Sequence, residues 1–188
     1  MLKVTAPIIL ASKSPRRQEL LNLMGLKFSV ELKDVDESYP ETLSAPEIAV
    51  YIAEKKARAF DAHPDEIIIT ADTIVAINGE ILGKPKDHNE AQEMLGKLSG
   101  SKHEVYTGVS INYRGKIVSF YDQTEVFCRI INAEEINYYI DIYQPFDKAG
   151  SYGVQDWFGL TVVEKLNGSY TNVMGLPTEK LYQYLLKI

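Results

Sequence analysis

The stretch EIIITADTIVAINGEIL, which runs from Glu66 to Leu82, decides the fold of this chain. Its apolar residues are mainly β-branched, which is typical of a buried strand, and Asn78-Gly79 is a favoured pair for a tight hairpin turn. One carboxylate, Asp72, interrupts the apolar run, and burying it without a partner would be unfavourable. Either the strand breaks and Asp72 is a turn or cap residue, or Asp72 faces a cleft and binds a metal or a proton. We favour the cleft.

Strand and helix patterns are mixed on both sides of this stretch. We expect strands at residues 8–11, 103–130 and 160–166, with a turn at Arg114-Gly115 in the second of these. Residues 147–159 are expected to form a loop, and residues 177–188 a closing amphipathic helix. Four further helices are expected to follow the capping residues Ser14, Ser44, Asp87 and Asn132. This mixture predicts an α/β (α+β) fold with a mixed sheet, in which the order of the strands stays open.

Length and composition predict one domain over residues 1–188. This domain could also consist of two lobes around a shared sheet. The chain is 45% hydrophobic and has a net charge of −6. Such a surface repels nucleic acid and anionic membranes, so we expect neither as a partner, and any anion site must be a local cluster. Cys128 is the only cysteine, and we expect it to be a small buried residue. The early apolar run is too short for a signal peptide or a membrane span, so we expect a cytoplasmic protein.

The segment ILASKSPRRQELL, from Ile9 to Leu21, places Arg16 and Arg17 where a helix begins. A helix N-terminus carries a partial positive charge, which favours an anion and disfavours two cations. A phosphate bound there would explain the pair, because arginine can hold phosphate with two parallel hydrogen bonds. The alternative is that both arginines are solvated and pair with carboxylates.

Each of the other charged residues indicates little about function by itself, but together they point to one kind of chemistry. Lys84 stands on a turn in LGKPKD, whereas Lys56 on a helix is by default a surface ammonium. Asp36 and Glu37 are by default part of a solvated loop, and Gln155 ends a glycine-bearing loop. Together they suggest cations for phosphates and carboxylates for Mg²⁺, and hence metal-assisted chemistry on a polyphosphate. The substrate does not follow from these patterns.

The same segments resemble, in the same order, the Maf family of nucleoside triphosphate pyrophosphatases, from about Ile8 to the final helix. The matching blocks are LASKSPRRQELL, VDES, AEKKA, ADTIV, LGKPKD, MLGKLSG, HEVYTGV, DKAGSYGVQ and NGSYTNVMGLP. The resemblance implies the fold of inosine triphosphate pyrophosphatases, a bent mixed sheet in two lobes with a central cleft, and a homodimer. It also implies hydrolysis between the α- and β-phosphorus of a nucleoside triphosphate, with Mg²⁺ or Mn²⁺ as the divalent metal.

The resemblance also implies roles for single residues. Asp72 matches the family's catalytic carboxylate, which is taken to accept a proton, and Glu37 matches its other acidic position. We expect these two to hold the metal. Lys55 stands beside Lys56 where some relatives have an acid, which bears on which lysine faces the site. The polar and phosphate-binding positions are matched by Ser12, Arg16, Arg17, Lys56 and Lys84.

The family divides by the base of its substrate. Members that act on dTTP and UTP are similar to this chain at Arg16, Thr73 and Gln155, whereas the 7-methyl-GTP branch tends to have Trp, Gln and Glu there. We therefore expect dTTP and UTP as substrates, with Arg16 bearing on substrate choice and Arg17 mainly holding phosphate. The alternatives are a 7-methyl-GTP pyrophosphatase and a non-catalytic nucleotide-binding regulator, because the family has been associated with septum formation and arrest of cell division.

Overall fold

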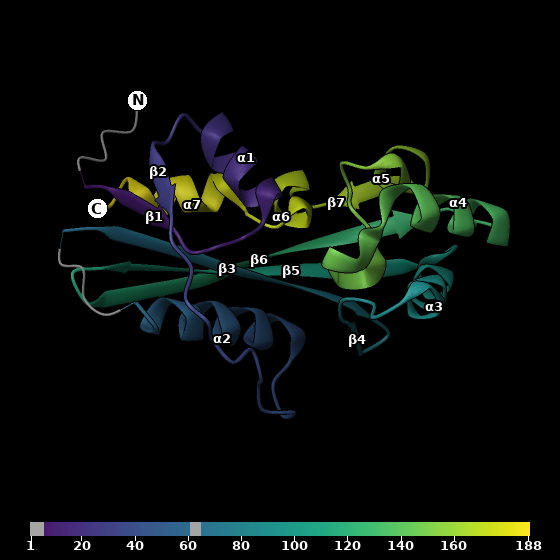
Figure 1. The fold of residues 1–188 in the computed structure, drawn as a ribbon, viewed down its shortest axis with the longest axis horizontal. Helices are drawn as coiled ribbons and strands as arrows, with labels where there is room; N and C mark the ends of the chain where they lie inside the picture. The colour runs from purple at the N-terminus through teal and green to yellow at the C-terminus, as the bar shows by residue number, and fades with distance from the viewer. Residues whose placement is uncertain (1–5, 61–64) are drawn as a thin grey trace. The chain divides into compact units, whose positions relative to one another are not determined.

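The computed structural model describes residues 6–60 and 65–188, where a seven-stranded sheet combines with helices (Figure 1). The strand order is β2-β1-β3-β5-β6-β7, and β4 pairs with β3 outside this path. The strands are β1 (Ile8–Leu10), β2 (Phe28–Val30), β3 (Ile67–Ile77), β4 (Glu80–Leu82), β5 (Lys102–Tyr113), β6 (Lys116–Cys128) and β7 (Val163–Asn167). The helices are α1 (Pro15–Leu23), α2 (Ala45–Arg58), α3 (His88–Leu98), α4 (Ala133–Tyr143), α5 (Trp157–Thr161), α6 (Tyr170–Met174) and α7 (Thr178–Leu185), with short 3₁₀ turns η1 (Pro145–Asp147) and η2 (Ala149–Ser151).

Parallel and antiparallel pairs coexist, which confirms the predicted mixed sheet. Strand β1 runs parallel to both β2 and β3, and α1 and α2 lie in the connections that parallel neighbours require. Strand β4 returns antiparallel to β3 through Asn78 and Gly79, whose φ angles are 51° and 81°. Positive φ at both central residues is what a tight hairpin turn needs, so the predicted turn is confirmed.

Strand β3 continues through Asp72 without a break. The alternative in which Asp72 ends the strand as a turn or cap residue is therefore wrong. The backbone keeps its ladder here because the carboxylate finds a charged partner, Lys56, and does not need to leave the sheet.

The described residues form two compact units, and β3, β5 and β6 contribute residues to both. The first unit contains the chain up to Thr73, Thr107–Asp122 and Gly175–Ile188. Helix α2 lies on one face of its strands, and α1 and α7 lie on the other (Figure 1). Helix α2 buries a stripe of five apolar residues, Ile48, Ala49, Ile52, Ala53 and Ala57.

Helix α2 approaches the sheet so closely that no side chain fits between them at Gly108. A Cβ on Gly108 would lie 2.3 Å from the carbonyl carbon of Ala49. The Thr70 hydroxyl of β3 donates to the carbonyl of Ala53, 2.6 Å away. These two contacts fix the distance between α2 and the strands. They therefore also fix the positions of the polar side chains that α2 carries.

The second unit contains Ile74–Tyr106 and Gln123–Met174. The segment 147–159, expected to be a loop, instead contains η2 and most of α5, and β7 begins at Val163 and not at residue 160. The reason is packing that a local pattern does not show. Phe158 is fully buried, and a Cβ on Gly159 would lie 1.8 Å from the Val154 carbonyl oxygen, so the chain coils tightly here. Strand β2 and helix α6 are short elements that sequence analysis did not predict.

Two further expectations concern Cys128 and the membrane. Cys128 is buried as predicted, and burial raises the pKa of its thiol to about 12, so it is no nucleophile at neutral pH. Among the helices of the described residues, none combines the length and apolar character needed to cross a bilayer. The single domain over residues 1–188, the bend of the sheet and the central cleft stay predictions.

Candidate active site

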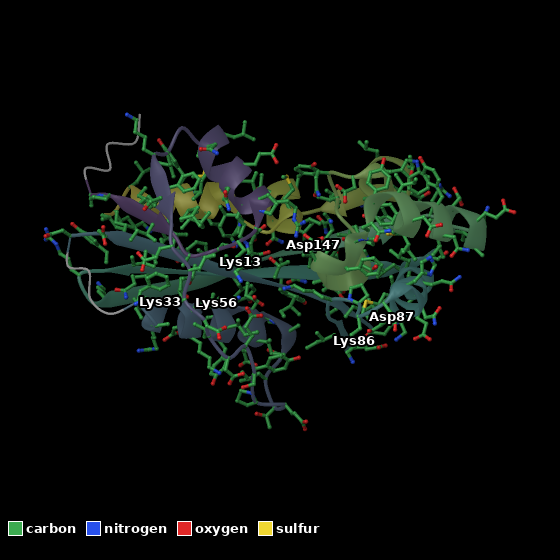
Figure 2. All side chains as sticks on the ribbon, in the orientation of Figure 1. Lys13, Lys33, Lys56, Lys86, Asp87 and Asp147 are labelled. Carbon is green, nitrogen blue, oxygen red and sulfur yellow. The ribbon has the colours of Figure 1, made fainter. Side chains whose placement is uncertain are left out.

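Lys56 joins two carboxylates that come from different elements. Its Nζ lies 2.8 Å from Oδ1 of Asp72, in the middle of β3, and 2.8 Å from Oε1 of Glu37, in the segment between β2 and α2. The side chains of Lys56 and Asp72 are only 17% and 14% exposed, whereas that of Glu37 is 52% exposed. Lys56 lies in the last turn of α2 (Figure 2). The predicted catalytic carboxylate thus faces a cation, and the surface-ammonium interpretation of Lys56 is wrong.

Lys55 has different partners from its neighbour. Its Nζ lies 3.0 Å from Oδ2 of Asp36 and 3.1 Å from the carbonyl oxygen of Ser38. Hydrogen bonds from Ser38 and Lys55 hold the pKa of the Asp36 carboxyl well below its usual range. Consecutive helix residues point about 100° apart, so only one of the two lysines can face β3. Lys56 is that residue.

The Arg17 guanidinium is held by acceptors from three segments. Nε donates to the carbonyl of Gly175 at 2.8 Å, and Nη1 donates to the Ala71 carbonyl at 2.9 Å and to Ser12 Oγ at 3.2 Å. Nη2 donates to Thr73 Oγ1 at 3.0 Å. Three of the predicted site residues, Ser12, Arg17 and Thr73, therefore lie in one hydrogen-bonded network.

The charge of Arg17 is set by its surroundings. Burial lowers the pKa of the guanidinium, the Asp72 carboxylate opposes this shift, and the neighbouring Arg16 adds to it. An arginine stays protonated in proteins, so Arg17 places a fixed positive charge beside the Asp72–Lys56 pair. Arg16 is the second residue of α1 and is partly buried. Ser14 caps this helix as predicted, and its side chain accepts from the Arg17 backbone N–H.

The donor set suits a divalent cation that also binds a substrate. No group of three or more His, Cys, Asp and Glu side chains able to hold a metal occurs within residues 6–60 and 65–188. However, Asp72 and Glu37 converge on one cationic atom, the nitrogen of the Lys56 ammonium. Mg²⁺ commonly takes one or two carboxylates and completes its shell with water and substrate phosphates. The residues therefore fit such a metal.

Lys84 and Gln155 lie in the second unit. Lys84 is exposed between β4 and α3, and the carbonyl of Gly83 beside it accepts from the backbone N–H of Gly150 at 3.0 Å. Gln155 Nε2 donates to Asp156 Oδ1 at 2.8 Å. Its Oε1 is buried and has no hydrogen-bond partner among the described residues. The Gln155 amide thus has an uncommitted acceptor.

Sequence analysis missed the residues that hold Gln155. Asp156 Oδ2 accepts from the Tyr139 hydroxyl at 3.1 Å, and that hydroxyl accepts from the Gly153 backbone N–H at 3.0 Å. A carboxylate only accepts, so Asp156 fixes which end of the amide faces it. The position of Asp156 directly after Gln155 was an available signal. Tyr139 gave none, because it matched the apolar face of α4.

A family model described as Maf-like protein matches residues 7–188. The chain belongs to the Maf family. This Maf chain is 52% identical over 184 residues to a dTTP/UTP pyrophosphatase of Phocaeicola vulgatus, a match that covers 96% of the chain and 95% of the relative. It is 50% identical over 181 residues to a dTTP/UTP pyrophosphatase of Flavobacterium psychrophilum, covering 95% and 93%. The family resemblance drawn from the motifs is confirmed.

The Maf fold also resembles that of a solved structure, a HAM1 protein from Coxiella burnetii. The two agree with a TM-score of 0.55 at 15% sequence identity, over 98% of this chain and 100% of the other. At such identity the likeness concerns the fold alone.

Proposed function

We propose that this Maf protein hydrolyses nucleoside triphosphates, with dTTP and UTP preferred, to the monophosphate and pyrophosphate. The observation that carries the proposal is a carboxylate in mid-strand, Asp72, paired with Lys56 and flanked by the Arg17 network. Relatives at about half identity over nearly their whole length bear the name of this activity. Cations beside a partly buried carboxylate suit a reaction in which a polyanion is held while a proton is removed.

The cationic side chains of the first unit are proposed to bind the phosphates. Lys56 Nζ carries three N–H donors, and its two carboxylate partners leave it able to turn toward a phosphate oxygen. Arg16 lies at the start of α1, where the helix dipole adds to its attraction for an anion. Both groups stabilise the charge that develops on the leaving pyrophosphate. Lys84 is proposed to contribute as a further phosphate ligand.

Asp72 is proposed as the proton acceptor for the attacking water. Its carboxylate is held by Lys56 in the unliganded protein, and a phosphate that draws Lys56 away leaves an oxygen of Asp72 to accept the proton. Asp72 and Glu37 would hold Mg²⁺ or Mn²⁺, which when bound neutralises phosphate charge and lowers the pKa of a water ligand.

Selection of the base is proposed for Gln155. An amide can both donate to and accept from the edge of a pyrimidine, whereas a glutamate there would suit a cationic methylated purine. One N–H of Nε2 is committed to Asp156, which leaves the other to donate to a pyrimidine carbonyl, and the buried Oε1 offers an acceptor that matches the N3–H of uracil and thymine. A homodimer and a cytoplasmic location are likewise proposed, on the family resemblance.

The test is a panel of nucleoside triphosphates assayed for pyrophosphate release with Mg²⁺ and with Mn²⁺. We expect dTTP and UTP to have the highest kcat/KM. Release of orthophosphate, or a preference for 7-methyl-GTP, would contradict the proposal. Asp72→Asn is the matched inactive control, because it keeps the shape of the side chain and removes its charge.

A further inference from the structure

The hydrogen bonds of Arg17 leave it little capacity for a ligand. A guanidinium has five N–H donors. Four are committed, one each to Gly175, Ser12, Ala71 and Thr73. Within residues 6–60 and 65–188, one N–H of Nη2 has no acceptor, so Arg17 cannot hold a phosphate with two parallel hydrogen bonds while this network is intact.

Thr73 has just as little capacity to recognise a base. A hydroxyl offers one hydrogen and two lone pairs. The Thr73 oxygen accepts from Arg17 Nη2 at 3.0 Å and shares a second hydrogen bond of 3.0 Å with Thr107 Oγ1. Thr107 is fully buried on β5, so it cannot touch a substrate itself. Its hydroxyl reaches the site through Thr73 and Arg17.

We propose that Thr107 and Thr73 are positioning residues that aim the last free N–H of Arg17 at a substrate phosphate, and that Thr73 does not recognise the base. The buried Thr107 holds the partly exposed Thr73, and Thr73 holds Nη2, the nitrogen with the uncommitted N–H. Gly175 completes the support, because its carbonyl fixes Nε at the other side of the guanidinium. The proposal rests on the proposed function for the identity of the substrate, but the phosphate-binding part is testable without it.

Thr107→Val removes the buried hydroxyl and keeps the volume of the side chain. The probe is inorganic triphosphate, which has phosphates and no base, and its affinity is measured by calorimetry. We expect binding to weaken about tenfold, as for loss of one hydrogen bond that orients a charged donor. KM for dTTP and for UTP should rise by the same factor, with kcat changed less and the ratio between nucleotides unchanged. Thr107→Ser should restore wild-type binding.

Ser110→Ala is the matched control, since Ser110 lies on the same strand, is equally buried and bonds Ser119 outside the Arg17 network. If Thr107→Val proves unstable, Thr73→Val makes the same test at a partly exposed position. The proposal is overturned if triphosphate affinity is unchanged in these variants, if Ser110→Ala weakens it equally, or if the preference among bases shifts. Absence of pyrophosphatase activity in the wild type would instead contradict the proposed function, while triphosphate binding still decides the role of Thr107.

Discussion

Replacement of Lys56 by methionine tests the central arrangement of the site. The substitution keeps the length of the chain and removes the ammonium that lies between Asp72 and Glu37. The two carboxylates then lose the ammonium that lay between them. We expect Lys56→Met to bind free Mn²⁺ more tightly than the wild type when no nucleotide is present.

The size of the effect follows from the contact between Lys56 and Asp72. At 2.8 Å and an effective dielectric constant of about 20, one pair of unit charges attracts by about 6 kcal/mol. Desolvation and residual solvent offset most of this, and measured values for partly exposed pairs are of order 1 kcal/mol. A divalent ion that no longer competes with the ammonium gains about this much binding free energy, which corresponds to an affinity about fivefold higher.

Binding of Mn²⁺ is measured by its electron paramagnetic resonance signal or by calorimetry, so the result is independent of turnover. Lys55→Met is the matched control, because it removes a neighbouring charge that pairs with Asp36 instead. The double variant Asp72→Asn/Lys56→Met should lose the gain. Equal tightening in the two single variants, or none in Lys56→Met, would refute the inference that Asp72 and Glu37 form the metal site.

Four further outcomes are expected. Asp72→Asn should lower kcat about a hundredfold or more while binding of inorganic triphosphate survives, because the proton acceptor is lost and the cations proposed to hold the phosphates stay. Gln155→Glu should lower dTTP and UTP turnover at least about tenfold, since a carboxylate cannot donate to a pyrimidine carbonyl. Gly108→Ala should destabilise the fold by about 2 kcal/mol or more in a denaturant titration, because its Cβ would meet the Ala49 backbone at 2.3 Å. His103 is buried and burial lowers its pKa to about 4, so between about pH 7.5 and about pH 5 the wild type should lose about 2 kcal/mol more stability than His103→Gln.

The sign of the His103 effect follows from linkage. In the unfolded chain the imidazole binds a proton near its ordinary pKa of 6.5, whereas the folded protein resists protonation down to about pH 4. Between these two pKa values the unfolded state therefore binds more protons than the folded state. The free energy of unfolding decreases as the pH is lowered, until the pKa of the folded state is reached. Parallel stability curves for wild type and His103→Gln would contradict this. Three results would contradict the other predictions. Wild-type turnover in Asp72→Asn would exclude Asp72 as the proton acceptor, and an unchanged substrate profile in Gln155→Glu would exclude Gln155 from base recognition. Full stability of Gly108→Ala would contradict the close packing of α2 on the sheet.

The helix starts and the tight turns could be predicted from the sequence. Asn132 Oδ1 accepts from the backbone of Glu135, and Asp87 Oδ1 accepts from that of Glu90, three residues on in each case. The Asn78-Gly79 turn depends on the φ angles of two adjacent residues. Such features need only side chains and backbone that are near one another in the chain, so the local pattern contains them.

The sequence also predicted which residue types form the site, but it did not predict which residues they contact. From the sequence, Asp72 could be either a turn residue or a strand residue that faces a cleft. The sequence also did not decide whether Lys55 or Lys56 faces the site. Only the packing of α2 on the sheet decided both, because it set which lysine reaches β3. Arg17 is the clearest case: its acceptors at Ala71 and Gly175 lie 54 and 158 residues away along the chain. Contacts of this length depend on which strands pair and in what order, and no local periodicity encodes that order. The sequence by itself therefore determined most of the longer elements and the kinds of charge in the site, and the tertiary structure decided the short elements and which charge faces which.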